Sequence, residues 1–291
     1  GGVDTVTMRG YARDYAITWT KDGWKIQDLR PTPNPNSYST DGTDTLKNVE
    51  FANFFDRTVV LGDGMAFLVN AVLRDSASTG SDIASSLSAK LASGALTPTQ
   101  AITQIVNTAG ATTSVATLAY QFFTGKIPGQ AGVDYLVSPT GPNANNLNSA
   151  YYQTFNLENR YINFAVNLGK LGEGKDAFAA KYGALSMVDA TREAYKTIFG
   201  AAPTDAKIHA MIDGRIDYFA AYGGDGANGI GTKAAMVGWL LAEAQKADLG
   251  VMVRSNDAWL TDLADGSAPF AISLLDPSNG YYKTDFIFGG Q

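Results

Sequence analysis

The amino-acid sequence predicts an α+β protein, in which a small N-terminal β-hairpin segment precedes a mainly α-helical, multi-helix domain. Two observations carry this prediction. Up to residue 62, apolar residues alternate with polar ones, which is the period of a strand. From Gly64 onward, they recur every three or four residues between Gly, Pro and Asn loops. We therefore expect a β-rich segment at 1–62, a helical domain at 63–275 and an extended C-terminal arm at 276–291.

The composition narrows the functional classes. Among 291 residues, 45% are apolar and 17% are charged, which is typical of a folded protein. The 28 acidic residues outnumber the 22 basic ones, and no basic run exists, so nucleic acid is not an expected partner. The chain has no cysteine, which excludes disulfides and thiolate metal sites. No apolar run is long enough to span a membrane, so we expect no transmembrane insertion.

The N-terminal segment carries a hairpin pattern. Tyr15, Ile17 and Trp19 alternate with polar residues, a Lys-Asp-Gly turn follows, and alternation resumes at Trp24. The chain opens with Gly1 and has no initial Met, so we expect it to be part of a longer protein.

Three aspartates of this segment are candidate calcium ligands. Calcium requires several hard oxygen ligands at once, and Asp4, Asp41 and Asp44 supply carboxylates near predicted turns. The alternative is that these aspartates only build the turns, as Asp-Gly and Asp-Thr pairs often do.

Several helices have clear boundaries. Thr97 and Pro98 begin one that ends before Gly110, and similar signals delimit helices at 114–124, 186–199 and 204–222. Helices are also expected at 233–246 and 256–264, which gives about eight to ten in all.

The region 118–169 is the most distinctive. Its last part, from residue 151, reads as a helix that is apolar around most of its circumference. The remaining sector is a narrow row of polar side chains at helical spacing: Gln153, Asn156, Arg160, Asn163 and Asn167. Amides and a guanidinium beside tyrosines can bind a neutral or anionic sugar but are poorly suited to acid–base chemistry. The alternative is that the amides cap backbone groups or face water.

We therefore expect a glycan-binding rim on this helix. Amides would meet sugar hydroxyls, tyrosine rings would meet sugar faces, and Arg160 would pair with an acidic group if the glycan has one. The expected rim residues are Tyr151, Tyr152, Asn156, Asn159, Arg160 and Asn163.

Catalytic patterns are missing from the sequence. His209 is the single histidine, so a histidine-based triad or zinc protease is disfavoured. The glycine-rich stretch 223–233 lacks the residue order of a phosphate-binding loop. Nothing places two carboxylates at the separation that glycoside hydrolysis needs. We expect no enzyme activity.

Two blocks of residues resemble a known family. The run YQFFTGKIPGQAGVDYLV at 120–137 and the run LNSAYYQTFNLENRYINFAVNL at 147–168 agree in order and spacing with the N-terminal anchoring region of alphaproteobacterial surface-layer (S-layer) proteins of the calcium-dependent, type I-secreted kind. Weaker agreement extends the resemblance over roughly 65–275. Residues 1–62 resemble the β segment that closes RTX calcium repeats, and 1–6 resemble the tail of one repeat.

This resemblance implies a non-catalytic, extracellular module on the outer face of the outer membrane. The implied partners are lipopolysaccharide O-polysaccharide and further copies of the protein in a lattice, with calcium as the ion. Two alternatives stay open. One is a self-assembling filament or sheet subunit that exchanges its aromatic tail at 281–288. The other is an accessory domain of a secreted RTX hydrolase.

Overall fold

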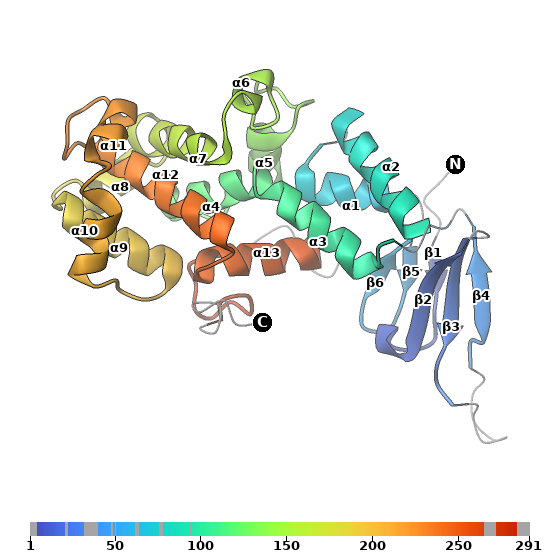
Figure 1. Cartoon of the computed structure of the whole chain (residues 1–291). Helices are drawn as coiled ribbons and strands as arrows, with labels where there is room; N and C mark the ends of the chain where they lie inside the picture. The colour runs from blue at the N-terminus through green and yellow to red at the C-terminus, as the bar shows by residue number, and fades with distance from the viewer. Residues whose placement is uncertain are drawn as a thin grey trace. The chain divides into compact units, whose positions relative to one another are not determined.

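The chain folds into two compact units. A computed structural model describes residues 5–20, 23–31, 40–47, 49, 51–61, 64–75, 78–92, 95–264 and 272–283. Unit 1 comprises Gly1–Thr108 with Leu260–Pro269, and unit 2 comprises Ala109–Trp259 with Phe270–Gln291. Figure 1 labels the elements of both units. The predicted α+β class, with strands first and helices after them, is confirmed.

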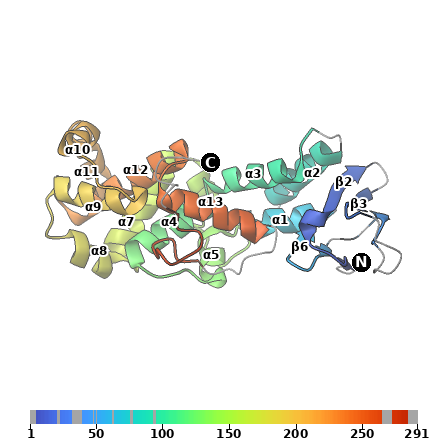
Figure 2. The ribbon, with the colours of Figure 1, turned by 90° about the horizontal axis from the view of Figure 1, so that it is seen from below.

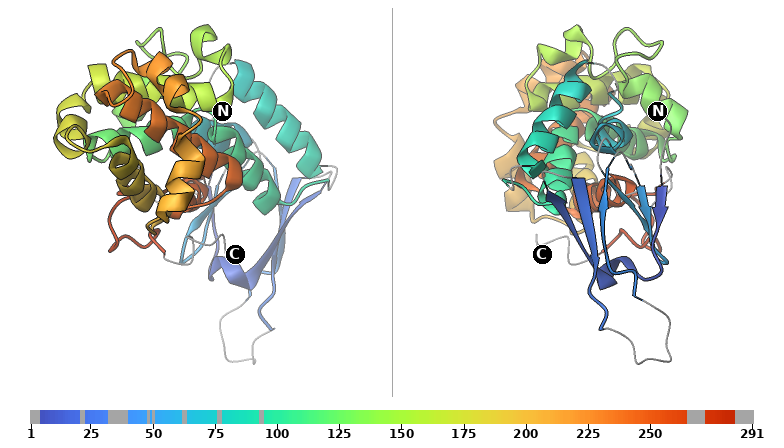
Figure 3. Two further views of the ribbon diagram at one scale, coloured as in Figure 1. Left: turned by 60° about the vertical axis from the view of Figure 1, so that its left-hand side comes forward. Right: turned by 90° about the vertical axis from the view of Figure 1, so that its right-hand side faces the viewer.

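Unit 1 begins with two small sheets, whose strands are drawn in shades of blue in Figure 3. In the first, β1 (Thr5–Thr7) runs parallel to β5 (Phe51–Asn53), which pairs antiparallel with β6 (Thr58–Val60). The second is the antiparallel meander of β2 (Tyr15–Thr20), β3 (Gly23–Asp28) and β4 (Thr43–Leu46). The predicted hairpin is therefore confirmed as β2 and β3, with Ile17 opposite the fully buried Ile26.

Three helices follow the strands: α1 (Gly64–Leu73), α2 (Ser78–Ala92) and α3 (Pro98–Ala109). The predicted start of α3 is confirmed by a reciprocal cap. The Gln100 backbone N–H donates to Thr97 Oγ1 at 3.2 Å, and the Thr97 backbone N–H donates to Gln100 Oε1 at 2.9 Å.

The regular elements in the described part of unit 2 are all helices, and Figure 2 shows them from below. Across the described residues of both units, the chain forms thirteen α-helices, more than the expected eight to ten. Those that begin in unit 2 are α4 (Thr113–Thr124), α5 (Gln130–Val137), α6 (Ala150–Gln153), α7 (Leu157–Val166), α8 (Lys175–Tyr182), α9 (Met187–Phe199), α10 (Asp205–Ile212), α11 (Ile216–Gly223), α12 (Ile230–Ala247) and α13 (Val251–Ala264). A π-helical turn, η2 (Asn167–Leu171), continues α7.

Helix ends in unit 2 follow the predicted signals. The side chains of Ser186 and Thr204 accept hydrogen bonds from the backbone N–H groups three residues later, and so cap α9 and α10. Gly125 and Gly200 end α4 and α9 in the left-handed conformation, with φ of 66° and 82°.

Two predicted helices are broken, which accounts for part of the larger count. The expected helix at 204–222 is interrupted at Arg215, whose φ of −125° and ψ of −1° are not helical, and becomes α10 and α11. The expected helix from 151 is interrupted at Asn156, which is extended and caps α7. The apolar period runs across both breaks, so periodicity alone does not reveal them.

Helix α12 forms the centre of unit 2. Its residues from Gly231 to Ala242 are all buried, and all of them except Thr232 and Lys233 are nonpolar. It packs against α7, α9 and α11, and Figure 1 shows α12 in orange beside α7 in yellow-green.

The backbones of α7 and α12 approach closely at Gly238. A Cβ atom there would lie 2.7 Å from the carbonyl oxygen of Tyr161 and 2.8 Å from Cβ of Ala165. Gly169, in η2, is packed just as closely, because a Cβ atom there would lie 2.5 Å from the ring of Phe123. The absence of a side chain at these two positions allows the helices to meet.

A buried polar network joins α4 to α13. Thr117 Oγ1 donates to Asn256 Oδ1 at 2.6 Å, and Asn256 Nδ2 donates to Ser114 Oγ at 3.0 Å. Next to it, burial raises the pKa of Asp257 from 3.8 to about 7, with a smaller contribution from the charge of Asp248. Asp257 therefore costs free energy when it ionises in the folded protein.

The C-terminal segment folds back onto its own unit. The backbone N–H of Leu274 donates to Gln121 Oε1 at 2.8 Å, and Ser255 Oγ donates to the carbonyl of Tyr281 at 2.8 Å. Leu274 is fully buried. Residues 272–283 thus form turns against α4 and α13, whereas an extended arm was expected from residue 276; the aromatic positions 286 and 288 lie outside the described residues.

We expect the substitution Gly238→Ala to destabilise unit 2 by about 1–3 kcal/mol, because the new methyl group would clash with α7. This would occur although Ala has the better helix propensity, by about 1 kcal/mol. The matched control is Gly132→Ala in α5, where a Cβ meets nothing within 4 Å and where a gain of up to about 1 kcal/mol is expected. Urea unfolding measures both; equal effects would contradict the close approach.

We expect Asp257→Asn to stabilise the protein at pH 8 and to flatten its pH dependence. Between 3.8 and about 7, the folded state binds more protons than the unfolded chain, so stability falls as the pH rises through this window. The substitution should recover about 2–4 kcal/mol above pH 7 and little at pH 4. Unfolding free energies measured from pH 4 to 8 test this, and parallel curves for the two proteins would refute it.

Candidate glycan-binding surface

The expected rim residues lie on α6, on α7 and at the turn between them. Asn156 begins α7, where its Oδ1 accepts the backbone N–H of Asn159 at 2.8 Å. Glu158 in the first turn complements the positive end of the helix dipole. The cap fixes the direction in which α7 leaves the turn.

Adjacent tyrosines on α6 have opposite environments. Tyr151 is 50% exposed, and its ring meets those of Tyr152 and Phe155 edge to face, both at 5.1 Å between centroids. Tyr152 is only 3% exposed, and burial raises the pKa of its hydroxyl. Tyr151 is thus placed to meet a ligand, whereas Tyr152 anchors α6 in the core, contrary to its expected place on the rim.

Arg160 is also buried, at 7% exposure, and burial lowers its pKa. Its guanidinium donates to the carbonyl of Ala111 at 3.0 Å, to Gln153 Oε1 at 3.2 Å and to the carbonyl of Phe155 at 3.3 Å. Arg160 therefore holds the α6–α7 turn against the start of α4. The expectation that it meets an acidic sugar at the surface does not fit this placement.

Asn159 and Asn163 remain partly accessible on α7. Asn163 Nδ2 donates to the carbonyl of Asn159 at 2.9 Å, and Asn159 Oδ1 accepts the hydroxyl of Tyr218 at 2.9 Å. Positions 156, 159 and 163 share one face of the helix. We call Tyr151, Asn156, Asn159, Asn163 and Tyr218 the amide–tyrosine surface.

Sequence reasoning missed Tyr218. This residue lies on α11, about a third of it is exposed, and its hydroxyl also lies 3.0 Å from Glu158 Oε1. Position 218 lies in the part of the sequence where the family resemblance is weaker, and nothing there singled it out.

The loop between α11 and α12 is organised by its own aspartate. Asp225 accepts the backbone N–H groups of Gly231 at 2.7 Å and Thr232 at 3.1 Å, so a carboxylate occupies the place where a phosphate would bind. Lys233 is fully buried and donates to the carbonyls of Tyr182 and Gly183 at 3.1 and 3.0 Å. In this loop, Asp225 and Lys233 are therefore both engaged with backbone groups of the protein.

His209 lies on the exposed side of α10. Its Nδ1 is 3.0 Å from Asp213 Oδ1, one helical turn away, and about half of its side chain is accessible.

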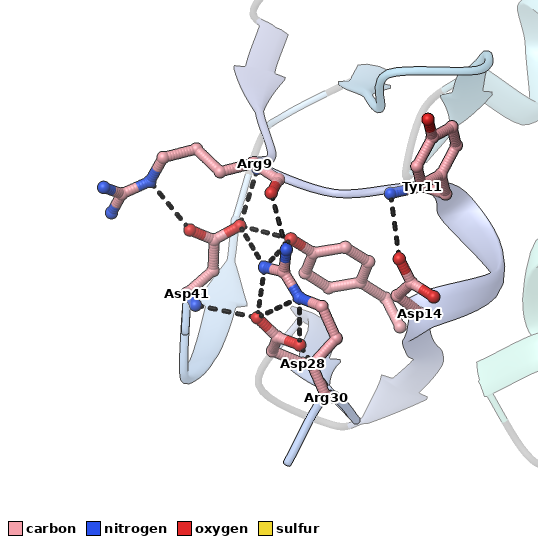
Figure 4. A network of polar contacts seen from close by, with 7 residues as sticks. Arg9, Tyr11, Asp14, Asp28, Arg30 and Asp41 are labelled. Carbon is pink, nitrogen blue, oxygen red and sulfur yellow. Dashed lines mark hydrogen bonds and ion pairs between the residues drawn. The ribbon is translucent and has the colours of Figure 1, made fainter. Parts of the chain in front are cut away.

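Two of the three expected calcium ligands, Asp41 and Asp44, lie within the described residues. Asp4 lies outside the described residues, and Asp44 is exposed on β4. Asp41 instead joins a network at the base of β2 and β3, shown in Figure 4. It accepts the Arg9 backbone N–H at 2.7 Å, Arg9 Nε at 2.9 Å and the hydroxyl of Tyr15.

Arg30 joins Asp41 to a second buried carboxylate. Its Nη2 donates to Asp28 Oδ2 at 2.6 Å and to the Tyr15 hydroxyl at 2.9 Å, and lies 3.7 Å from Asp41 Oδ2. Hydrogen bonds from Arg30 hold the pKa of Asp28 well below its usual range. Burial alone would raise the pKa of Asp41, but hydrogen bonds from Tyr15 and Arg9 outweigh it and lower that pKa.

These surroundings do not suit a calcium ion at Asp41, because a guanidinium already neutralises the carboxylates. Within the described ranges, no group of three or more His, Cys, Asp or Glu side chains could hold a metal. Calcium therefore stays a prediction from the sequence.

We expect Arg30→Met to destabilise unit 1 clearly more than a matched control, since it leaves the carboxylates of Asp28 and Asp41 without their cation. The control is Arg13→Met, whose side chain is 79% exposed and lies 3.9 Å from Asp14, and which should cost less than about 1 kcal/mol. Chemical unfolding at pH 7 measures both. The deficit should shrink as the pH falls below 3.8, where the depressed carboxylate pKa values lose their stabilising effect. A loss for Arg30→Met no larger than the control's would contradict the account.

No helix in the described parts of the chain is both long and apolar enough to cross a membrane.

Among curated proteins, none matches the chain. The model of the RsaA N-terminal domain family matches residues 112–284, which is more than half of the chain and includes the whole amide–tyrosine surface. The match begins later than the expected 65–275 and supplies nothing for the RTX interpretation of 1–62, which stays a prediction. The chain belongs to the RsaA N-terminal domain family, and its helical part is an S-layer protein module of the cell surface.

Proposed function

We propose that this module anchors its protein to the outer face of the outer membrane by binding the O-polysaccharide of lipopolysaccharide. The observation that carries the proposal is the amide–tyrosine surface, which lies entirely inside the matched family domain. Its accessible groups are carboxamides and tyrosines, which suit sugar hydroxyls and ring faces.

The recognition chemistry would be hydrogen bonding combined with ring contact. Asn156 Oδ1 is committed to the helix cap, so its exposed amide nitrogen is the group that would donate to a hydroxyl. Tyr151 would offer its ring to an apolar sugar face. Arg160 and Tyr152 would act indirectly, by holding the turn and α6 in place.

Retention at the surface does not require a tight single contact. A polysaccharide repeats the same sugar units, and copies of the protein side by side would engage many of them at once. Weak contacts that are linked in this way give a much higher overall affinity than any one of them alone, because each contact after the first forms intramolecularly. We propose that self-association in a surface lattice contributes in this way.

The direct test is binding of the chain to lipopolysaccharide purified from the bacterium that makes it. Smooth lipopolysaccharide, which carries O-chains, is compared with the form that lacks them, in calcium and in chelator. Saturable binding to the smooth form alone is expected. Equal binding to both forms, or to neither, would contradict an O-polysaccharide anchor.

We expect Tyr151→Ala to weaken this binding by about tenfold without unfolding the protein, because the ring is half exposed and its loss removes contact area. The comparison is Tyr152→Ala, which should reduce stability by about 3–5 kcal/mol, since it empties a buried site. Titration with smooth lipopolysaccharide and thermal unfolding separate the two effects. Wild-type affinity in Tyr151→Ala would remove this residue from the site.

A further inference from the structure

We infer that Tyr218 on α11 is a specificity-determining residue of the glycan site, which holds one sugar ring beside Asn159. This inference rests on the proposed function and adds a second helix to the binding surface. Three arguments support it: the position of the side chain, its rigidity and the hydrogen-bond acceptors around its hydroxyl.

The first argument is position. The hydroxyl of Tyr218 lies 2.9 Å from Asn159 Oδ1, so the aromatic ring and the amide row of α7 belong to one continuous surface. The two residues are 59 positions apart in the sequence, and the packing of α11 against α7 and α12 brings them together.

The second argument is rigidity. The Tyr218 hydroxyl donates to Glu158 Oε1 at 3.0 Å. The ring of Tyr222 packs edge to face against the Tyr218 ring, with 5.2 Å between the two ring centroids. Glu158 is itself fixed by Lys246, whose Nζ lies 3.1 Å from Oε2 and 2.8 Å from Glu243 Oε1. An exposed ring that is already fixed loses little entropy when a ligand binds.

The other exposed tyrosine of the surface is held differently. Tyr151 is held by ring contacts with Tyr152 and Phe155, whereas Tyr218 is tied by its hydroxyl to polar groups of α7. Of the two, Tyr218 therefore has the better defined ring orientation, and orientation decides which sugar face can stack.

The third argument is a count of hydrogen-bond donors. The Tyr218 hydroxyl has one hydrogen but two acceptors within reach, Glu158 Oε1 and Asn159 Oδ1. The carboxylate is the stronger acceptor. Whichever of the two takes the hydrogen, Asn159 Oδ1 has a second lone pair that can accept a hydroxyl from a sugar stacked on the ring. The site would thus prefer a sugar whose hydroxyl lies next to its stacked face.

The test compares three variants of the full chain in titrations with smooth lipopolysaccharide, with thermal unfolding measured in parallel. Tyr218→Ala removes the ring and should weaken binding by about tenfold or more. Tyr218→Phe keeps the ring but loses its hydroxyl anchor, and should weaken binding by about two- to tenfold. The matched control is Tyr195→Ala on α9, a half-buried tyrosine whose hydroxyl accepts Lys207 Nζ at 2.6 Å, and it should leave binding unchanged.

The outcomes separate this inference from the proposed function. If the unaltered chain fails to bind smooth lipopolysaccharide, the glycan function itself is refuted. If it binds and Tyr218→Ala binds equally well, only the role of Tyr218 is overturned. Should Tyr218→Ala unfold, Tyr218→Phe decides: reduced affinity at unchanged melting temperature supports the inference, and wild-type affinity overturns it. A loss in Tyr195→Ala as large as in Tyr218→Ala would also overturn it.

Discussion

The close contact between α7 and α12 at Gly238 is the constraint on which the rest of unit 2 depends. Helix α12 is buried on nearly all sides, so its neighbours form the outer layer of the unit. Because no side chain separates the two backbones at Gly238, α7 is held directly against this central helix. The buried face of α7 is thereby fixed, and the face with Asn159 and Asn163 is left toward the outside.

Polar contacts then define the surface that this packing leaves open. Arg160 holds the α6–α7 turn through three oxygen acceptors, and Asn156 caps the helix that follows. Glu158, Lys246 and Tyr218 tie α7, α12 and α11 together at the edge of the same surface. Two kinds of polar residue are therefore adjacent along α7: those that maintain the backbone and those whose groups are available to a ligand.

The sequence predicted what depends on local signals, such as the β2–β3 hairpin and the capped starts of α3 and α9. It could not predict which polar residues of one helical row are buried. Arg160 looked like a surface cation because its acceptors on Ala111 and Phe155 are backbone carbonyls, which leave no trace in the sequence. The contacts of Asp41 with Arg9 and Tyr15 could not be predicted either, because both partners are distant from it in the chain. Tyr218 was missed because its place depends on the packing of α11.

The measurement that tests the central claim most directly is hydrogen–deuterium exchange of the chain with and without purified O-polysaccharide. The account predicts slower exchange in the peptides that contain the α6–α7 turn, the first turns of α7 and the middle of α11, with no change in the strands of unit 1. Protection limited to unit 1, or spread evenly over the helices of unit 2, would contradict the claim that the amide–tyrosine surface binds the glycan.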